Sequence, residues 1–156
     1  MTKVSLHELR RALNNVPSGD LPDLCIRLAR YKKENKELLS YLLFEADDEP
    51  EYICNVKTEI DQLFSELSRN TPYLTKKGLR KILAFTNQHI RYSGQKRTEA
   101  ELLIYFCKKF KKEVPFRTNI TIKNIFTRQI ERIKKTISTL HEDLQFDFNE
   151  EVKMLE

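Results

Sequence analysis

The stretch from Thr98 to Phe110 reads Thr-Glu-Ala-Glu-Leu-Leu-Ile-Tyr-Phe-Cys-Lys-Lys-Phe. Its six consecutive apolar or aromatic residues, Leu102 to Cys107, would leave no side of a helix facing water. Because a run this short fits a buried strand as well as a buried helix, the flanking residues decide. Thr98 and Glu101 have the spacing of a capping box, and Ser93-Gly94 is typical of the end of a preceding helix. We therefore predict a central helix that is enclosed by the other helices.

The composition is that of a charged, globular, helical protein. The 156 residues are 40% hydrophobic and 33% charged, and a chain of this length buries a core without disulfides or metals. Three glycines and five prolines leave little material for hairpin turns, which disfavours an all-β fold. We predict one all-α domain over residues 1–146, followed by a frayed acidic tail over residues 147–156. The fold is either a helical bundle or a short α-α superhelix of about six or seven helices.

Capping signals place the predicted helices along the chain. The expected N-terminal caps include Ser5, Asp20, Asn35 and Thr75. The acidic stretch from Asp47 to Glu51 has two interpretations, a cation site made of carboxylates or the start of a helix with Pro50 in its first turn. We favour the helix start, because the spacing of a calcium loop is absent.

Six apolar residues late in the chain follow heptad spacing. They are Phe126, Ile130, Ile133, Ile137, Leu140 and Leu144. We expect them on one long helix. Fewer than three full heptads are present, so packing within the domain is favoured over a coiled coil between two copies. The sequence therefore predicts a monomer, or a weak homodimer through the 126–144 seam.

A sequence echo indicates two related helical units. Glu37-Leu38-Leu39-Ser40-Tyr41 is followed 64 residues later by Glu101-Leu102-Leu103-Ile104-Tyr105. Each copy follows an Arg-Tyr pair and precedes a joint that contains proline. Two such units would stack like a short α-solenoid, each covering the apolar face of the other.

Two stretches carry a resemblance to known proteins. Arg-Leu-Ala-Arg-Tyr-Lys-Lys-Glu-Asn-Lys-Glu-Leu-Leu (27–39) and Ile-Arg-Tyr-Ser-Gly (90–94) are similar to a small uncharacterised bacterial family of all-helical proteins. The resemblance covers most of the chain from Leu21 to Leu144. It implies an all-helical fold, and it brings no activity, ligand or catalytic residue.

The charge is distributed unevenly along the chain. Residues 1–71 have a net charge of −3, residues 72–138 of +13, and residues 139–156 of −5. The basic middle segment is a candidate nucleic-acid-binding face, although a solvated helical surface explains the same charges. We favour the solvated surface, because no nucleic-acid-binding motif accompanies the charge. The candidate anion-binding residues are Lys76, Lys77, Arg80, Lys108, Lys109, Arg128, Arg132 and Lys135.

The Arg-Tyr pairs are the other candidate binding residues. Arg30 and Arg91 each carry a planar guanidinium that suits a carboxylate or phosphate, and Tyr31 and Tyr92 would wall such a site. The favoured alternative is structural, in which arginine caps a helix end and the tyrosine ring packs against its neighbours.

Motifs for catalysis, metals or cofactors are absent from the sequence. The histidines, His7, His89 and His141, are far apart, and no phosphate loop or nucleophile elbow is present. An odd number of cysteines is expected to form buried free thiols in a reducing cytoplasm. These are Cys25, Cys54 and Cys107. We therefore expect no enzymatic activity and no cofactor.

The sequence does not indicate a membrane protein or a secreted protein. No apolar run is long enough to span a bilayer, and the N-terminus lacks the apolar core of a secretory signal. The sequence favours a cytoplasmic, non-enzymatic helical-repeat module that binds a protein or peptide in a groove between helices. The alternative is a nucleic-acid-associated protein that uses the basic segment 76–135.

Overall fold

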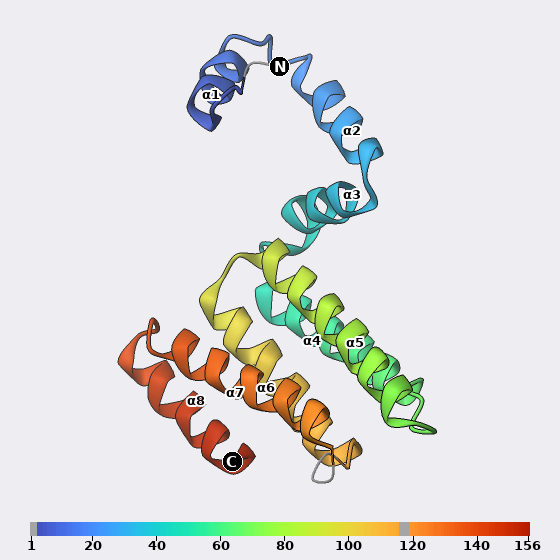
Figure 1. Ribbon diagram of the computed structural model, residues 1–156. Coiled ribbons are helices and arrows are strands. Elements are labelled where there is room, and N and C mark those ends of the chain that lie inside the picture. Colours follow the sequence, from blue (N-terminus) through green and yellow to red (C-terminus); the bar gives the residue numbers. More distant parts are fainter. Residues whose placement is uncertain (1–2, 116–118) are drawn as a thin grey trace. The chain divides into compact units, whose positions relative to one another are not determined.

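The protein is all-α in a computed structural model that describes residues 3–115 and 119–156. These residues form eight α-helices, one π-helical turn and no strand (Figure 1). The elements are α1 (Leu6–Asn14), α2 (Leu21–Tyr31), α3 (Lys33–Ser40), η1 (Tyr41–Glu45), α4 (Glu49–Ser65), α5 (Pro72–Ser93), α6 (Lys96–Glu113), α7 (Ile120–Ile137) and α8 (Glu142–Leu155).

The contacts within the chain group into two compact units. Unit 1 is Met1–Phe44 and unit 2 is Glu45–Glu156, whereas the sequence predicts one domain over 1–146. The two copies of the Glu-Leu-Leu echo fall into different units and different surroundings. Leu38 is exposed in unit 1, and Leu102 is fully buried in unit 2.

Helix α6 is the centre of unit 2, as the sequence predicts. It packs against α4, α5, α7 and α8. Five of the six residues from Leu102 to Cys107 are buried, and Tyr105 is half-buried with its hydroxyl donating to Asp61 Oδ1 at 2.6 Å. The rings of Phe106 and Phe110 pack edge to face with centroids 5.9 Å apart. The apolar stretch is therefore a buried helix and not a strand.

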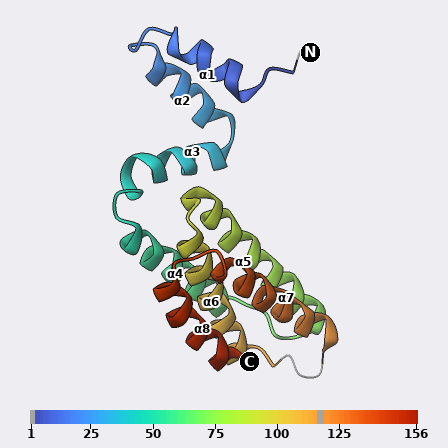
Figure 2. The ribbon, with the colours of Figure 1, turned by 90° about the vertical axis from the view of Figure 1, so that its left-hand side faces the viewer.

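Helices α4 and α6 run in the same direction in a fixed register. Ion pairs or hydrogen bonds join Lys57 to Glu101 and Asp61 to Tyr105, each pair separated by 44 residues. Helices α6 and α8 are related in the same way, because Glu151 of α8 pairs with Lys108 of α6, 43 residues earlier. Two rows result in unit 2, with α4, α6 and α8 in one row and α5 and α7 running the opposite way in the other (Figures 1 and 2).

Two of the predicted helix starts are confirmed. Ser5 and Glu8 form the capping box of α1, with backbone-to-side-chain hydrogen bonds of 2.7 and 3.2 Å. Asp48 caps α4 and accepts from the backbone N–H of Glu51 at 3.1 Å, with Pro50 in the first turn. The favoured interpretation of the acidic stretch as a helix start is therefore correct.

Other predicted caps are wrong because the helices begin earlier. Thr71 caps α5 in place of Thr75, whose buried hydroxyl instead donates to Ser68 O and Thr71 O. Helix α6 begins at Lys96, which places Thr98 inside its first turn, where the hydroxyl donates to Glu49 Oε1 at 2.6 Å.

In unit 1 one predicted helix start is correct in position and another is wrong. Asp20 is the N-cap residue of α2 and Pro22 lies in the first turn, as the sequence predicts, although the Asp20 side chain makes no capping hydrogen bond. Asn35 lies within α3, and its Nδ2 donates to Leu28 O at 2.8 Å. This bond ties α3 to α2 and does not begin a helix.

The C-terminal region differs most from the prediction. The expected long helix is interrupted, because α7 ends at Ile137 and the chain turns before α8 begins. The heptad residues of α7 are buried within unit 2, so the predicted 126–144 seam is not an open dimer face. The expected frayed tail is wrong, since residues 147–155 belong to α8, and Phe148, Val152 and Leu155 are buried.

Two glycines occupy positions where a side chain would be unfavourable, one for its backbone conformation and one for a close contact. Gly94 follows α5 with φ 68°, the left-handed conformation that closes a helix, as the sequence predicts. A Cβ at Gly78 would meet the side chain of Leu67, so the absence of a side chain lets α5 approach the end of α4 closely.

Removal of a buried phenylalanine ring should lower the free energy of unfolding far more than removal of an exposed one. We expect Phe106→Ala to lower the free energy of unfolding by about 3–5 kcal/mol, because it leaves a cavity under α6. Phe146→Ala in α8 is the matched control, since that side chain is 68% exposed, and it should change stability by less than about 0.5 kcal/mol. Urea titration followed by circular dichroism measures both. Equal losses would show that α6 is not the centre of the core.

Candidate partner-binding surfaces

The apolar faces of unit 1 are open to solvent. Among its described residues only Tyr41 is buried, and α1, α2 and α3 contain no buried residue. Twelve of the 17 exposed large hydrophobic residues found in the described parts of the chain belong to this unit. They are Val4, Leu6, Leu9, Leu13, Leu24, Ile26, Leu28, Tyr31, Leu38, Leu42, Leu43 and Phe44. Unit 1 is therefore a set of amphipathic helices without a core of their own.

Helix α1 carries its exposed leucines on one side. Leu6, Leu9 and Leu13 follow the spacing of three and four residues that aligns side chains along a helix. Arg11 lies on the opposite side of the same helix. Leu6 is 85% exposed, so its side chain meets almost none of the described residues.

Helices α2 and α3 pack on each other and enclose an apolar hollow. The hollow has a volume of about 290 Å³. Its lining residues are Cys25, Leu28, Ala29, Asn35, Leu38, Leu39 and Leu42. The bond from Asn35 to the backbone of Leu28 holds its two walls together. The result is a preformed apolar concavity on the surface of unit 1.

The predicted Arg-Tyr pairs lie in unlike surroundings. Tyr31 is 78% exposed at the end of α2, whereas Tyr92 is 9% exposed. The hydroxyl of Tyr92 accepts from Gln88 Nε2 at 2.6 Å, and its ring lies edge-on to that of His89. Arg91 is exposed and donates from Nε to Asn87 O at 3.4 Å. The structural interpretation fits Arg91 and Tyr92, while Arg30 and Tyr31 belong to the open surface of unit 1.

Several candidate anion-binding residues are paired with acidic groups. Lys108 pairs with Glu151, and Lys109 lies 3.2 Å from Asp61 and 2.7 Å from Glu113. Helix α8 thus brings part of the negative C-terminal segment onto the basic end of α6. This local neutralisation explains why the net charge of +13 over residues 72–138 does not produce an equally basic surface.

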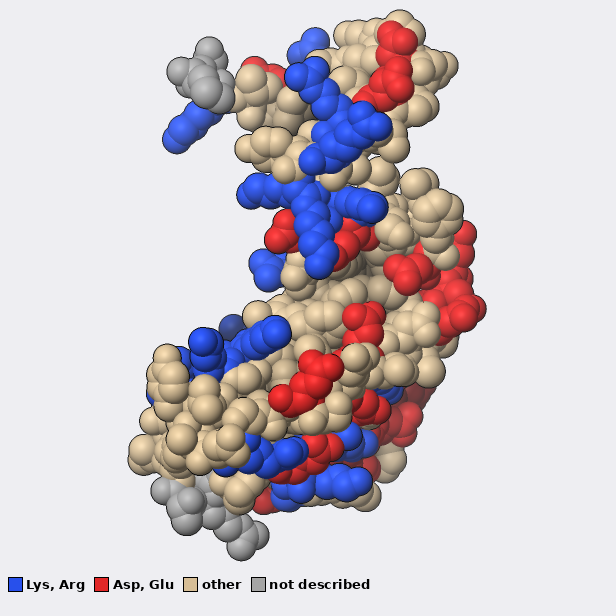
Figure 3. Space-filling model, turned by 90° about the vertical axis from the view of Figure 1, so that its right-hand side faces the viewer, with Lys and Arg blue, Asp and Glu red and all other residues tan. Residues whose placement is uncertain are grey.

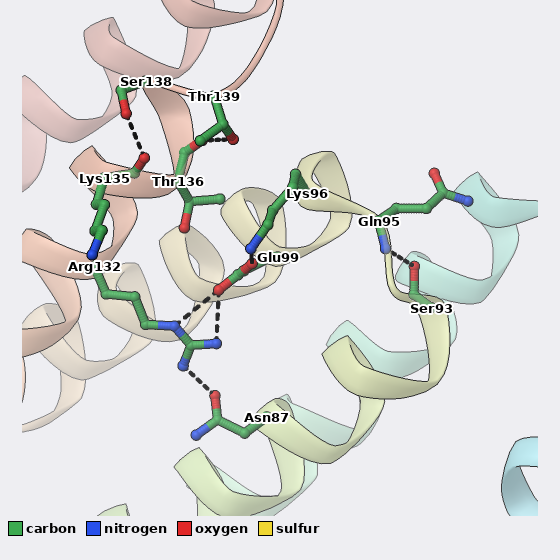
Figure 4. Close-up of polar contacts among 10 residues, drawn as sticks. All are labelled: Asn87, Ser93, Gln95, Lys96, Glu99, Arg132, Lys135, Thr136, Ser138 and Thr139. Atoms are coloured by element: carbon green, nitrogen blue, oxygen red, sulfur yellow. Dashed lines mark hydrogen bonds and ion pairs between the residues drawn. The ribbon is translucent and has the colours of Figure 1, made fainter. Parts of the chain in front are cut away.

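Arg132 is the centre of a polar cluster that joins three helices (Figure 4). Its Nε and Nη2 lie 3.0 and 2.8 Å from Glu99 Oε1, and its Nη1 donates to Asn87 Oδ1 at 2.5 Å. Lys96 Nζ donates to the other Glu99 oxygen at 2.9 Å. Burial disfavours the ionised form of Glu99, but the hydrogen bonds from Lys96 and Arg132 outweigh it, so the pKa of Glu99 lies below its ordinary value of 4.5. Arg132 therefore joins α7 to α6 and α5, and its guanidinium already has partners within unit 2.

Six basic side chains, four at the start of α5 and two on α7, reach solvent. In the described parts of the chain, no hydrogen bond or ion pair joins these side chains to a partner. They are Lys76, Lys77, Arg80 and Lys81 on α5, and Arg128 and Lys135 on α7. On the face of the molecule shown in Figure 3, basic and acidic side chains lie close to each other in most places. The four cations at the start of α5 therefore form a small cluster, whereas Arg128 and Lys135 lie apart from each other along α7.

A ladder of polar contacts along α4 and α6 was not expected from the sequence. Lys57 pairs with Glu101 at 2.7 Å and lies 5.3 Å from the centre of the Tyr105 ring. Burial, together with the hydrogen bond to Asp61, raises the pKa of Tyr105 to about 12. Arg69 pairs with Glu113 at 3.0 Å. The polar partners recur at a separation of 44 residues in the sequence. This separation could have predicted the contacts only if the helices had been known to be parallel.

The hollow between α4, α6 and α8 is lined by charges that largely neutralise one another. Lys57, Glu101, Lys108 and Glu151 all line it, and they form two ion pairs. Because these side chains already have partners, the hollow offers a ligand few free charges.

Two of the histidines, His89 and His141, make hydrogen bonds that belong to the fold. The hydroxyl of Tyr52 lies 2.8 Å from His89 Nδ1, and His141 accepts from the backbone at the start of α8. The described residues contain no group of three or more His, Cys, Asp or Glu that could hold a metal ion. Among the described helices, none is long and apolar enough to cross a membrane.

The cysteines differ from the expectation that all three are buried. All are free thiols, but Cys25 and Cys54 are exposed and only Cys107 is buried. Burial raises the pKa of Cys107 to about 12. Cys25 is exposed because it lies on α2, and the described residues of unit 1 do not cover the apolar face of that helix.

Comparisons with family models, curated proteins and solved structures find no match to this chain. The resemblance to a bacterial helical family therefore stays a prediction.

Removal of the Arg132 guanidinium should destabilise the protein in a pH-dependent way. We expect Arg132→Ala to lower the free energy of unfolding by about 2 kcal/mol at pH 7, because it removes charged hydrogen bonds from buried Glu99. A carboxyl whose pKa is lowered by folding contributes stability above its unfolded pKa, and this contribution is lost as the pH falls through the folded pKa. The decrease in the free energy of unfolding caused by Arg132→Ala should therefore become smaller below about pH 4.5.

Urea titrations at several pH values measure this effect. Arg128→Ala is the control, because Arg128 is exposed on the same helix, and it should cost less than about 0.5 kcal/mol at any pH. A loss from Arg132→Ala that is the same at acidic and neutral pH would assign the role of Arg132 to packing instead of charge.

Proposed function

We propose that this chain is a non-enzymatic interaction module whose unit 1 binds a protein partner through the apolar faces of α1, α2 and α3. The observation that carries the proposal is the concentration of exposed large hydrophobic residues in this unit. Contiguous apolar patches on soluble proteins mark interaction sites, because burying them in a partner removes apolar surface from water.

The size of unit 1 supports the same conclusion. A unit that spans only Met1–Phe44 is near the lower limit of about 40 residues for folding without disulfides, metals or oligomerisation. Its described residues contain neither a disulfide nor a metal-binding group. A partner that covers the leucines of α1 and the hollow of α2 and α3 would supply the missing core.

The mode of binding follows from helix geometry. The leucines of α1 have the spacing with which an amphipathic helix docks into an apolar groove. The hollow between α2 and α3 is such a groove. The exposed ring of Tyr31 is a suitable anchor, since aromatic side chains contribute strongly to interfaces.

We assign unit 2 the role of a folded scaffold. The alternating directions of α4 to α8 support the proposal that α4–α5 and α6–α7 are stacked helical repeats. Exposed free thiols at Cys25 and Cys54 fit a reducing cytoplasm.

A second candidate function is binding to nucleic acid. It is favoured by one observation, the cluster of Lys76, Lys77, Arg80 and Lys81 without partners among the described residues. Phosphate binding by such a cluster would weaken steeply as the salt concentration rises. It would use unit 2 and leave the apolar faces of unit 1 unexplained, so we rank it second.

Photo-crosslinking in cells should separate the two functions. We expect a photoreactive phenylalanine analogue at Leu13 to give protein adducts of defined mass that survive nuclease, because Leu13 lies on the apolar face of α1. The analogue at Arg11, on the opposite face, is the matched control and should give few adducts. Gel electrophoresis and mass spectrometry detect them.

The analogue at Arg80 tests the second candidate. Adducts from Arg80 that vanish with nuclease, together with none from Leu13, would replace the first function with nucleic-acid binding. Equal labelling from Leu13 and Arg11 would show that the apolar face has no specific partner.

A further inference from the structure

We propose that the partner of unit 1 is a second copy of this chain, with α1 of each copy packed into the α2–α3 hollow of the other. This inference rests on the proposed function and names the partner. It starts from the fact that unit 1 contains both an apolar ridge, on α1, and an apolar hollow, between α2 and α3. Each copy would therefore provide one ridge and one hollow.

Neither surface is covered by the described residues of unit 1. Leu6, Leu9 and Leu13 are exposed on α1, and Leu28 and Leu42 are exposed at the hollow. Within this unit the extensive helix packing is between α2 and α3. A second copy supplies the same two surfaces in reversed roles, so one two-fold interface covers all of them.

The spacing of apolar residues on the two helices also matches. On α1 and just beyond it they are Leu6, Leu9, Leu13 and Val16. On α2 they are Leu21, Leu24, Leu28 and Tyr31. Both series follow intervals of three, four and three residues, which is the pattern of helices that pack lengthwise in bundles. The apolar stripe of α1 therefore has the length and period of the stripe on α2, and the two surfaces of α2, stripe and hollow, meet at Leu28.

The charge of unit 1 predicts how such a dimer responds to salt. Residues 1–44 contain eight basic and five acidic side chains, a net charge of +3. Two copies repel each other weakly, and salt screens this repulsion while the apolar contact persists. Association should therefore stay constant or strengthen as salt rises, which is the opposite of binding to a polyanion.

Sedimentation equilibrium of the full chain tests the dimer. We expect the mass to rise with concentration from 18.6 kDa towards twice that value. Leu9→Asp should weaken association at least about a hundredfold, because it places an unpaired carboxylate in an apolar interface. Arg11→Asp, on the opposite face of α1, is the matched control and should change the dissociation constant by less than about threefold.

Thiol labelling locates the interface through the native cysteines. Cys25 lines the hollow, Cys54 is exposed on α4, and Cys107 is buried. We expect the labelling rate of Cys25 by N-ethylmaleimide to fall as protein concentration rises, while that of Cys54 stays constant. Leu9→Asp should keep Cys25 reactive at all concentrations. Mass spectrometry of peptides gives both rates in one sample.

The outcomes separate this inference from the function on which it rests. A chain that stays monomeric at every concentration, with a constant Cys25 rate, overturns the second-copy partner. If Leu13 still crosslinks to a different protein, the binding function survives with another partner. A dimer that leaves Cys25 reactive, or that Leu9→Asp and Arg11→Asp weaken equally, also overturns the proposal, because its interface then lies elsewhere. A concentration-dependent dimer that protects Cys25 supports it.

Discussion

The enclosure of α6 is the constraint on which unit 2 depends. Its apolar side chains point in all directions, so helices are needed on all sides to remove them from water. Helices α4 and α8 cover it along one row, and α5 and α7 cover it from the other. Polar contacts then fix the register of this packing. Lys57 of α4 pairs with Glu101 of α6, and Lys108 of α6 pairs with Glu151 of α8, so each ion pair matches one position along α6 to one position on its neighbour.

Unit 1 shows what happens where no such central element exists. Its helices are amphipathic, so each has only one face that requires cover, and three short helices cannot enclose one another. Local signals still form them, as the capping box of Ser5 and Glu8 does for α1. Helix formation and core formation are therefore separate in this chain. The first is achieved in both units, and the second only in unit 2.

The sequence predicted the helices better than their surroundings. The all-α fold, the central helix, the cap at Asp48 and the glycine end at Gly94 follow from local chemistry, which neighbouring residues determine. Thr75 and Thr98 misled because they resemble caps in sequence, yet their hydroxyls bond to groups that only the folded chain brings near. The tail looked frayed because acidic residues concealed the buried stripe of Phe148, Val152 and Leu155. The open face of unit 1 could not be predicted, since apolar periodicity does not reveal whether a covering surface lies within the same chain.

The parallel register of α4 and α6 has a consequence for how the chain folds. Contacts such as Lys57 to Glu101 and Asp61 to Tyr105 each close a loop of more than forty residues. Helical proteins usually gain speed from local contacts, whereas distant pairs must first overcome the entropy of loop closure. A hairpin of α4 and α5 shortens the loop that must close before α6 aligns with α4. We therefore expect folding of unit 2 to be slower than the formation of its individual helices.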